Sequence, residues 1–557
     1  MEQVANWIVK EVCPESLAKV EQNPQVQGLP PLVRRILAQR GVAEADQIER
    51  FLKPRFSDLS DPFLLPDMKL AVDRLMQAID NKETVALFGD YDVDGVTSVA
   101  LLKEVFDHYD LKSHCFVPHR LEEGYGMSQP GLERCLEEYQ PDLIMAVDCG
   151  TTSIDEIGWL KEKDIDVIVC DHHECNPDAR PACLALVNPK VGDDFHYLCS
   201  AGVAFKVAHA MLKTRPNPNI DLKSFMDIIA LGTVADIVPL IGENRILVRK
   251  GLHCLRNTAN CGLVALKQVT KLGKIVFTSD IGFRLGPRLN AAGRLDTAKA
   301  SLNLLLERNP ERAQEIAEQL DEQNKERQQL ESRMFDEAMA MLESDGHPKD
   351  RCSIVLGSDD WHPGVVGIVA SRLMRRYHRP TFIVAFDETG LGKGSGRSVE
   401  NISLVSALHE SNDLLIKGGG HEMAAGLTIW KQNFPDFQKR FEEIVASNAR
   451  SEYLVPKIYV DAETDLSELT LSLLDSYELM EPFGSHNPQP LLICYDVQLA
   501  GEPTILSKKH LRLELYQNGA IREAIYFGGA YKYGHPKYSD VYVIDGDLCT
   551  ECVGHFD

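Results

Sequence analysis

Residues 84–95 read Thr-Val-Ala-Leu-Phe-Gly-Asp-Tyr-Asp-Val-Asp-Gly, an apolar run followed at once by a cluster of acids. The apolar part is typical of a short buried strand. Asp90, Asp92 and Asp94 follow it, and three carboxylates this close repel one another unless a cation lies between them. A divalent metal ion is the natural candidate. Taken alone, the segment also fits a solvated acidic turn.

The pattern Asp-x-Asp-x-Asp-Gly also opens the calcium-binding loop of an EF-hand. That loop requires a glutamate at its twelfth position and a helix before it. Counting from Asp90, the twelfth residue is Leu101, and a strand is expected before the motif. The EF-hand interpretation is therefore rejected.

Apolar runs that end in an acidic or imidazole residue recur along the first half of the chain. Their order is Leu143–Val147 before Asp148, Ile165–Cys170 before Asp171-His172-His173, and Ile228–Ala235 before Asp236. We interpret all of these runs as strands. Residues 98–108 and 128–139, between the runs, have helical character. Short apolar strands that alternate with amphipathic helices predict an α/β fold with a parallel, doubly wound sheet.

In such a sheet, ligands bind beyond the carboxyl ends of the strands, so the acidic termini should converge on one crevice. An oxygen-rich set with some imidazole suits Mn²⁺ or Mg²⁺ better than structural zinc. The number of carboxylates exceeds what one ion needs, and two ions roughly 3.5–4 Å apart fit better. Alone, His172-His173 could also be an ordinary pair of loop histidines. The predicted set is Asp90, Asp92, Asp94, Asp148, Asp171, His172, His173 and Asp236.

These motifs resemble those of the DHH phosphoesterase superfamily and, within it, of the RecJ family of bacterial single-strand DNA exonucleases. The resemblance extends from about residue 25 to about residue 530. The four main motifs match residues 89–95, 147–150, 171–173 and 232–236. Further matching segments are residues 118–126, 286–294, 361–368, 393–398 and 418–421.

The resemblance implies stepwise 5′-to-3′ hydrolysis of single-stranded DNA to 5′-mononucleotides by two-metal catalysis, in DNA repair and recombination. It implies two Mn²⁺ or Mg²⁺ ions, with Asp171, His172 and His173 in catalytic positions. Some family members carry a histidine two residues before the first motif aspartate, where this chain has Phe88. The partition of ligands between the two ions therefore stays open. The implied metal ligands are Asp90, Asp92, Asp94, Asp148, His172 and Asp236.

A nuclease that starts at a 5′ end must hold a terminal phosphate, and guanidinium groups do so with two parallel hydrogen bonds. The resemblance assigns Arg120, Ser395 and Arg397 to this pocket, and Arg288 and His421 to further substrate contacts. Each arginine could instead form a surface salt bridge. His421 could also belong to a tight loop and cap a neighbouring helix.

The chain of 557 residues is expected to contain several domains. We expect an N-terminal segment (1–60), a DHH domain (61–300), a connecting helix (301–348), a smaller α/β DHH-associated domain (349–450) and a C-terminal β-rich, OB-like domain (455–557). Pro310–Ser344 has no internal Gly or Pro, which favours one long helix. We also expect a cleft between the two α/β domains that admits a single strand and excludes a duplex.

The DHH-associated domain is expected to contain the strand Ser353–Leu356, the helix Val365–Tyr377, the strand Thr381–Phe386 and then a glycine-rich loop. Strands of the OB-like domain are expected at Lys457–Asp461, Leu491–Leu499, His510–Tyr516 and Ala524–Phe527. Its aromatic side chains could stack on bases or fill the barrel: Tyr526, Phe527, Tyr531 and Tyr533.

The last residues depart from the family pattern. Cys549, Cys552 and His555 stand where closing strands are expected. An iron–sulfur cluster of the [4Fe–4S] type needs four cysteines, so this tail offers at most a partial metal site. An altered tail without a metal is the alternative.

Lys and Arg number 59 against 83 Asp and Glu, which gives a net charge of −24. Phosphate contacts favour basic surfaces. Because the whole chain is acidic, we expect positive charge only locally, in the groove that binds DNA. We find no apolar stretch long enough for a membrane span and no secretory signal. The cysteines are widely spread, which favours a reducing cytoplasm.

We therefore expect a cytoplasmic, monomeric enzyme with single-stranded DNA as its substrate and a helicase and a single-strand-binding protein as candidate partners. One alternative is a phosphodiesterase for short oligonucleotides or small nucleotides. The other is a non-catalytic, DNA-binding replisome scaffold.

Overall fold

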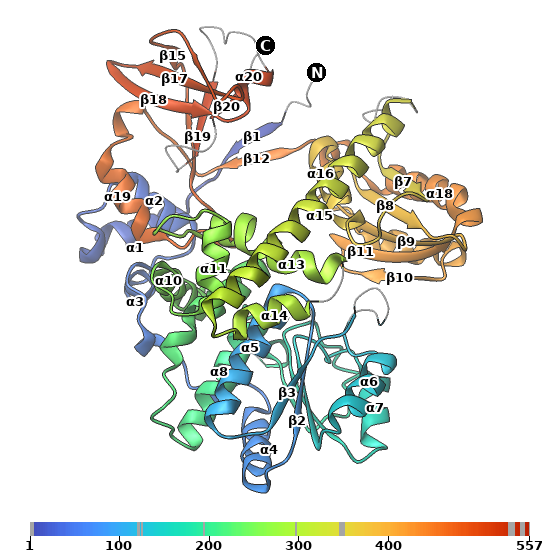
Figure 1. Cartoon of the computed structure of the whole chain (residues 1–557). Coiled ribbons are helices and arrows are strands. Elements are labelled where there is room, and N and C mark those ends of the chain that lie inside the picture. Colours follow the sequence, from blue (N-terminus) through green and yellow to red (C-terminus); the bar gives the residue numbers. More distant parts are fainter. Residues whose placement is uncertain are drawn as a thin grey trace. The chain divides into compact units, whose positions relative to one another are not determined.

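The computed structural model describes residues 5–119, 123, 126–192, 195–295, 298–344, 351–532, 541–545 and 552–555 of the chain (Figure 1). Two compact units are present. The larger unit contains Ile8–Gly293, Thr297–Glu318 and Tyr459–Asp557, and the smaller unit contains Met1–Trp7, Arg294–Asp296 and Gln319–Ile458. No described helix is long and apolar enough to cross a membrane. Arg120 lies outside the described residues.

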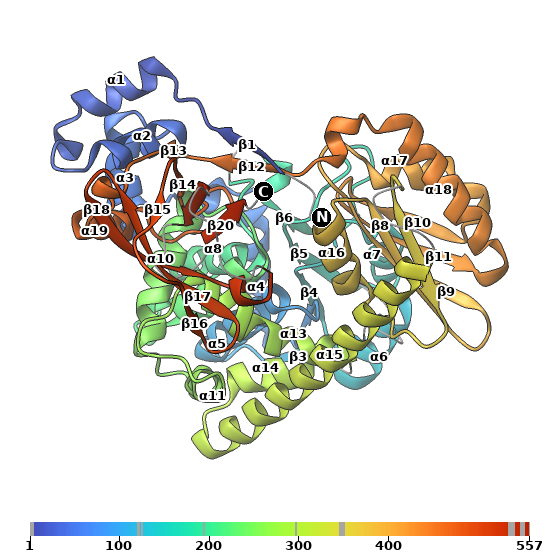
Figure 2. The same ribbon diagram turned by 90° about the horizontal axis from the view of Figure 1, so that it is seen from above.

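A five-stranded parallel sheet forms the centre of the larger unit. Side chains of its central strands are buried on both faces, which explains why their sequences are continuously apolar. Figure 2 shows several of these strands from above. The strand order is β3 (Ser113–Phe116), β2 (Val85–Gly89), β4 (Leu143–Val147), β5 (Asp166–Cys170) and β6 (Ala185–Val187).

The chain reverses its direction across this sheet between β2 and β4. From β2 it passes through α5 (Val93–His108) to the edge strand β3, and then returns past β2 through α6 (Gln129–Tyr139) to β4. A crevice forms at such a switch point, beyond the carboxyl ends of the strands. The doubly wound α/β fold predicted from the sequence is confirmed.

Helices cover both faces of the sheet (Figure 1). On one face, α6 and α7 (Ile154–Lys161) share a core with β2, β4 and β5. On the other face, α5 packs against β2 and β3, and α4 (Met68–Asn81) packs against β6 and α8 (Ser200–Thr214). Both layers of the doubly wound arrangement are thus present.

The predicted strand Ile228–Ala235 is wrong, because these residues belong to helix α9 (Met226–Ala235). This helix packs against α5, α8 and α10 (Gly242–Arg256), so almost all of its side chains are buried. A helix that is apolar all round has the same short sequence signature as a buried strand. Asp236 still reaches the expected edge, because it follows the last residue of α9.

Further helices follow α10 along the chain. They are α11 (Cys261–Val269), α12 (Thr278–Asp280), the π-helix η6 (Ile281–Leu285), α13 (Gly286–Leu295) and α14 (Lys299–Leu306). The predicted long helix follows as α15 (Pro310–Ser344), with 35 residues. Its residues belong to the larger unit up to Glu318 and to the smaller unit from Gln319.

The N-terminal helices share a hydrophobic core with the C-terminal part of the chain. These helices are α1 (Pro14–Gln22), α2 (Pro31–Gln39) and α3 (Ala45–Leu52). They pack against α19 (Leu471–Met480) and the strand β14 (Leu491–Cys494). The first strand, β1 (Asn6–Val9), pairs with β12 (Lys457–Val460).

The smaller unit contains a five-stranded mixed sheet in the order β10-β11-β9-β8-β7. The predicted strands at 353–356 and 381–386 and the helix at 365–377 are present with small changes at their ends. The strands are β7 (Ile354–Ser358), β8 (Thr381–Phe386), β9 (Leu391–Arg397), β10 (Lys417–Gly420) and β11 (Ala424–Trp430), and the helices are α16 (Val366–Tyr377), α17 (Leu404–Glu410) and α18 (Phe434–Asn448).

The glycine-rich segments that we expected to be loops are strands. Lys393–Gly396 lies within β9, and Gly418–Gly420 lies within β10. Glycine is required in β9 because aromatic and aliphatic side chains cover its backbone: a Cβ atom at Gly396 would lie 2.4 Å from the ring of Phe382. Packing across the sheet therefore overrides the weak strand propensity of glycine.

The described residues of the C-terminal β-rich region form two four-stranded sheets. Tyr526 is buried in its core, and the ring of Phe527 packs against His510. The side chain of Tyr531 and the whole of Tyr533 lie outside the described residues. One sheet has β13 (Ala462–Glu463), β14, β19 (Val541–Asp545) and β20 (Cys552–His555), and the other has β15 (Gln498–Leu499), β16 (Thr504–Leu506), β17 (His510–Gln517) and β18 (Ala520–Tyr526).

The expectation that the tail lacks closing strands is wrong. Residues 552–555 form β20, which pairs antiparallel with β19. The side chains of Cys552 and His555 and the whole of Cys549 lie outside the described residues, so the partial metal site stays a prediction.

Candidate metal centre

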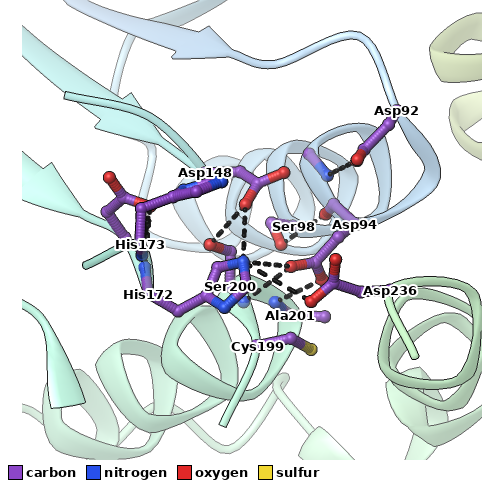
Figure 3. A network of polar contacts seen from close by, with 12 residues as sticks. Asp92, Asp94, Ser98, Asp148, His172, His173, Cys199, Ser200, Ala201 and Asp236 are labelled. Atoms are coloured by element: carbon purple, nitrogen blue, oxygen red, sulfur yellow. Dashed lines mark hydrogen bonds and ion pairs between the residues drawn. The ribbon is translucent and has the colours of Figure 1, made fainter. Parts of the chain in front are cut away.

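The predicted acids and histidines come together at the carboxyl edge of the parallel sheet. Figure 3 shows six of them, Asp92, Asp94, Asp148, His172, His173 and Asp236. Asp90 follows β2 and Asp148 follows β4, so these two carboxylates flank the switch point. Asp171-His172-His173 follow β5, and Asp236 follows α9. The convergence predicted from the sequence is therefore observed.

His172 lies at the centre of the cluster. Its Nε2 atom is 3.4 Å from an oxygen of Asp148, 3.4 Å from an oxygen of Asp236 and 3.8 Å from Oδ2 of Asp94. Burial lowers the pKa of His172 to about 4, so the imidazole is neutral at physiological pH. A neutral imidazole with carboxylates around it is the form that binds a metal ion.

The N-terminus of α8 holds Asp94 in place. The backbone N–H groups of Ser200 and Ala201 donate to its two carboxylate oxygens, at 2.7 and 2.9 Å. The hydroxyl of Ser200 also donates to Oδ1 of Asp148 at 2.8 Å (Figure 3). One helix terminus thus orients an acid in the first turn of α5 and an acid that directly follows β4.

Asp171 accepts hydrogen bonds from several donors around it. They come from the N–H of Thr151 at 3.0 Å, the N–H of His172 at 2.7 Å and the N–H of His173 at 3.2 Å, and Nδ1 of His173 lies 2.7 Å away. Burial acts to raise the pKa of Asp171, but hydrogen bonds from His173 and Thr151 outweigh it and hold this pKa below its usual value. Asp171 is therefore an ionised group that orients the two histidines.

The carboxylates nearest His172 have strongly raised pKa values. Burial and the charge of Asp92 raise the pKa of Asp94 to about 7, and burial and Asp94 raise that of Asp236 to about 9. Burial and Asp94 also raise the pKa of Asp148 well above its usual value. Desolvation and like-charge repulsion are both relieved when a cation enters such a cluster.

The backbone conformation at three positions allows these acids to lie close together. Asp148 has a φ of +62°, in the left-handed region that aspartate tolerates better than most residues. Gly95 and Gly232 permit close approach, because a Cβ atom at Gly95 would lie 2.5 Å from the carbonyl oxygen of Asp90, and one at Gly232 would lie 3.0 Å from Oδ1 of Asp94.

The donor set fits Mn²⁺ or Mg²⁺. Three groups of residues could each hold an ion, because within each group one ligand atom from every residue lies within 4.8 Å of the others. The groups are Asp90-Asp92-Asp148, Asp94-His172-Asp236 and Asp148-His172-His173. Oδ2 of Asp236 is buried without a hydrogen-bond donor among the described residues, although His172 lies near it. Carboxylate oxygens dominate, and imidazole completes the set, which is the ligand chemistry of these ions.

Sequence reasoning missed several residues that orient the centre. Asn188 donates to Oγ1 of Thr151 and to the carbonyl of His173, both at 2.9 Å, and Asn290 accepts a hydrogen bond of 3.1 Å from the N–H of Val93. The position of Asn188 directly after strand β6 was a signal, because polar residues at strand ends line this edge. Ser200 and Asn290 had no comparable signal.

The predicted substrate residues lie in both units. Arg288 is on α13 of the larger unit and donates to the carbonyl of Arg284 at 2.6 Å. In the smaller unit, Arg397 donates to Oγ of Ser395 at 3.0 Å and to the carbonyl of Gly396 at 2.7 Å. His421 is exposed, and its N–H donates to the carbonyl of Ala424 at 2.8 Å.

Arg397 is a half-buried cation without an ion pair among the described residues, so the salt-bridge alternative is not observed for it. Burial lowers its pKa. A Cβ atom at Gly367, in α16, would lie 3.2 Å from the guanidinium and 3.0 Å from Oγ of Ser395. Glycine thus allows the backbone of α16 to lie close to a guanidinium and a hydroxyl, which are both phosphate-binding groups.

Sequence profiles of known families match three parts of the chain. The "DHH family, N-terminal domain" matches residues 84–233, the "DHHA1 domain" matches residues 351–447, and the "RecJ OB domain" matches residues 460–545. The single-stranded-DNA-specific exonuclease RecJ of Haemophilus influenzae is 36% identical over 533 residues, which covers 89% of this chain and 89% of that protein. The chain belongs to the RecJ family.

Other RecJ proteins agree with this assignment. The RecJ of Bacillus subtilis is 36% identical over 91% of this chain, and the chain spans 64% of the length of that relative. The crystal structure of Thermus thermophilus RecJ with Mn²⁺ has a TM-score of 0.82 at 29% identity, covering 97% of this chain and 76% of that one. The same protein was also solved with Mg²⁺. The predicted family, its α/β and OB-like fold and its Mn²⁺ or Mg²⁺ chemistry are confirmed.

Proposed function

We propose that this protein is a metal-dependent exonuclease that hydrolyses single-stranded DNA from 5′ to 3′ and releases 5′-mononucleotides, in DNA repair and recombination. The observation that carries this proposal is the carboxylate cluster around His172 in a chain of the RecJ family. Relatives named single-stranded-DNA-specific exonucleases support the substrate class.

Six side chains of the cluster would hold two ions. When bound, Mn²⁺ or Mg²⁺ supplies an activated hydroxide and stabilises the charge that develops on the phosphoryl oxygens. Ser200 and the N-terminus of α8 keep Asp94 and Asp148 oriented for binding. The proposed ligands are Asp90, Asp92, Asp94, Asp148, His172 and Asp236.

His173 is proposed to contact the scissile phosphate. Burial opposes its charge, but the hydrogen bond with Asp171 raises the pKa of His173 to about 9. The imidazole is therefore a cation at neutral pH and can donate a charge-assisted hydrogen bond to a phosphate oxygen. In this arrangement Asp171 keeps the charge on His173 and also fixes the neighbouring His172.

Arg397 and Ser395 are proposed to bind the 5′-terminal phosphate. The support is the half-buried guanidinium, which lies beside the Ser395 hydroxyl and forms no ion pair in the part of the chain that the structure describes, because a buried cation is stabilised when an anion joins it. Arg120 is proposed for the same pocket and Arg288 and His421 for further substrate contacts, all on the basis of the family pattern.

Product analysis tests this function. Single strands labelled at the 5′ or at the 3′ end are incubated with Mn²⁺, with Mg²⁺ and with chelator. The expected result is immediate release of a labelled mononucleotide from the 5′-labelled strand and gradual shortening of the 3′-labelled strand, only with metal. Release of the 3′ label first, or cleavage in chelator, would contradict the proposal.

The two alternatives predict different results. A phosphodiesterase for small nucleotides would prefer dinucleotides over long strands, whereas the C-terminal β-rich domain favours longer substrates. A non-catalytic scaffold would need no metal centre, and here the complete acidic set is retained.

We further propose that the enzyme acts as a monomer in the cytoplasm, with a helicase and a single-strand-binding protein as partners. The cysteines that the structure describes are all free thiols, which fits a reducing compartment. Sedimentation of the purified protein would measure the oligomeric state.

A further inference from the structure

Two large apolar side chains of the larger unit are exposed, one directly after Asp236 and the other on a π-helix that packs against α9. Ile237 directly follows Asp236, and 75% of its surface is exposed. Phe283 lies on the π-helix η6, and 80% of its surface is exposed. Apolar side chains this exposed lose the free energy that burial would give them.

The backbone at both positions is unusual. Ile237 has a φ of +61°, which is strained for a β-branched residue. A π-helix is a rare element that often marks functional sites. Strain of this kind persists only when the surrounding structure enforces it, and it concentrates at sites of binding or catalysis.

The two elements are fixed to each other and to the acidic turn. α9 packs against η6, and a Cβ atom at Gly286 would lie 3.7 Å from Cβ of Ala235. Beyond η6, Asn290 on α13 accepts the N–H of Val93 at 3.1 Å, and a Cβ atom at Gly293 would lie 2.9 Å from the carbonyl oxygen of Tyr91. The exposed side chains therefore have fixed positions relative to the metal ligands.

Exposed lysines lie on a loop that is attached to η6. Arg284, within η6, donates to the backbone carbonyls of Thr270 and Lys271, which holds the loop after α11 beside η6. Lys271 and Lys274 in this loop are exposed. An exposed aromatic ring with neighbouring cations is the combination that proteins use to bind single-stranded nucleic acid without sequence preference.

We infer that Phe283, with Ile237, forms a stacking platform for the nucleobases of the single strand that enters the metal centre. This inference rests on the proposed function and adds to it. The ring supplies base-dependent but sequence-tolerant affinity, because every nucleobase presents a π-face. The lysines of the adjacent loop contact the phosphate backbone.

Binding to bases can be separated from binding to the backbone. Wild type and Phe283→Ala are titrated in chelator with a fluorescent oligothymidylate and with an abasic strand of the same length. We expect wild type to bind the thymidylate roughly tenfold more tightly than the abasic strand, in the range for one stacked base. Phe283→Ala should lose most of this difference, and Phe283→Trp should keep it.

A second variant separates binding from folding. Ile237→Gly removes the side chain and relieves the positive φ, so the melting temperature should stay equal or rise while the thymidylate preference falls. Leu70→Ala on α4, where Leu70 is 52% exposed, is the matched control and should keep the preference.

If Phe283→Ala prefers the thymidylate over the abasic strand as strongly as wild type does, the inference is overturned. The surface would then be a site for a protein partner. If wild type instead neither binds nor cleaves single strands, the proposed function itself fails, and the inference fails with it. These two failures are distinguished by the wild-type measurement alone.

Discussion

The hydroxyl of Ser200 donates a hydrogen bond of 2.8 Å to Oδ1 of Asp148, while the N–H of the same residue donates to Asp94. Outer residues that orient metal ligands typically change metal affinity by about 10- to 100-fold. We predict that Ser200→Ala lowers the affinity for Mn²⁺ by about tenfold with a small change in melting temperature. Ser200→Thr keeps the hydroxyl and should recover most of the affinity, as measured by isothermal titration calorimetry. Equal affinities in wild type and Ser200→Ala would contradict this role.

Asp171 is predicted to act through the histidines that it orients. In Asp171→Asn the charge that keeps His173 protonated is lost, so the pKa of His173 should fall towards or below its usual value. We expect kcat on single-stranded DNA to fall by about 100-fold, and the pH profile of the remaining activity to decline at a lower pH than in wild type. A parallel drop in activity at all pH values, with an unshifted profile, would indicate a purely structural role.

Binding of Mn²⁺ should release protons. In the metal-free protein the pKa of Asp94 is about 7 and that of Asp236 is about 9, because of burial and neighbouring carboxylates. The metal binds the deprotonated forms, so its affinity should rise with pH between about 6 and 9. Calorimetry in two buffers of different ionisation enthalpy counts the protons, and Asp236→Asn should release fewer of them. An enthalpy of Mn²⁺ binding that is equal in both buffers would contradict this prediction.

The same raised pKa values affect the stability of the metal-free protein. Carboxyl groups of the unfolded chain titrate near pH 4, so between about pH 4 and pH 9 the folded state binds more protons than the unfolded state. The contribution of these groups to stability therefore falls as the pH rises through this window. We expect the melting temperature of Asp236→Asn in chelator to exceed that of wild type more at pH 9 than at pH 5.

Two glycines offer a matched pair of substitutions. A Cβ atom at Gly232 would lie 2.3 Å from Oγ1 of Thr97 and 3.0 Å from Oδ1 of Asp94, whereas one at Gly158 in α7 would meet nothing within 4 Å. Gly232→Ala should lower the free energy of unfolding by about 1–3 kcal/mol and weaken Mn²⁺ binding. Gly158→Ala should be neutral or stabilise by up to about 1 kcal/mol. Chemical denaturation measures both, and equal effects would contradict the packing argument.

Arg397 is predicted to determine the preference for a 5′-phosphate. Arg397→Lys keeps a positive charge but loses the planar pair of donors. We expect the ratio of kcat/KM values for 5′-phosphorylated and 5′-hydroxyl strands to fall by about tenfold, mainly through KM. A ratio equal to that of wild type would exclude Arg397 from the phosphate pocket.

Local sequence patterns predicted the sheet and the acidic edge correctly. β2, β4 and β5 are short apolar runs that each end in an aspartate, and parallel strands place their carboxyl ends at one edge. The same reasoning failed for residues 228–235, because a fully buried helix and a fully buried strand share one apolar signature. It also failed for β9, where the need for glycine arises from Phe382 on the neighbouring strand.

The chemical identity of the metal centre was thus determined by the sequence itself, because carboxylates and imidazoles at strand ends are local features of the chain. Only the tertiary structure decided how these groups are held. Ser200 reaches Asp94 across 106 positions of sequence, and Asn290 reaches Val93 across 197. Such contacts depend on how helices pack on the sheet, and no local pattern encodes them.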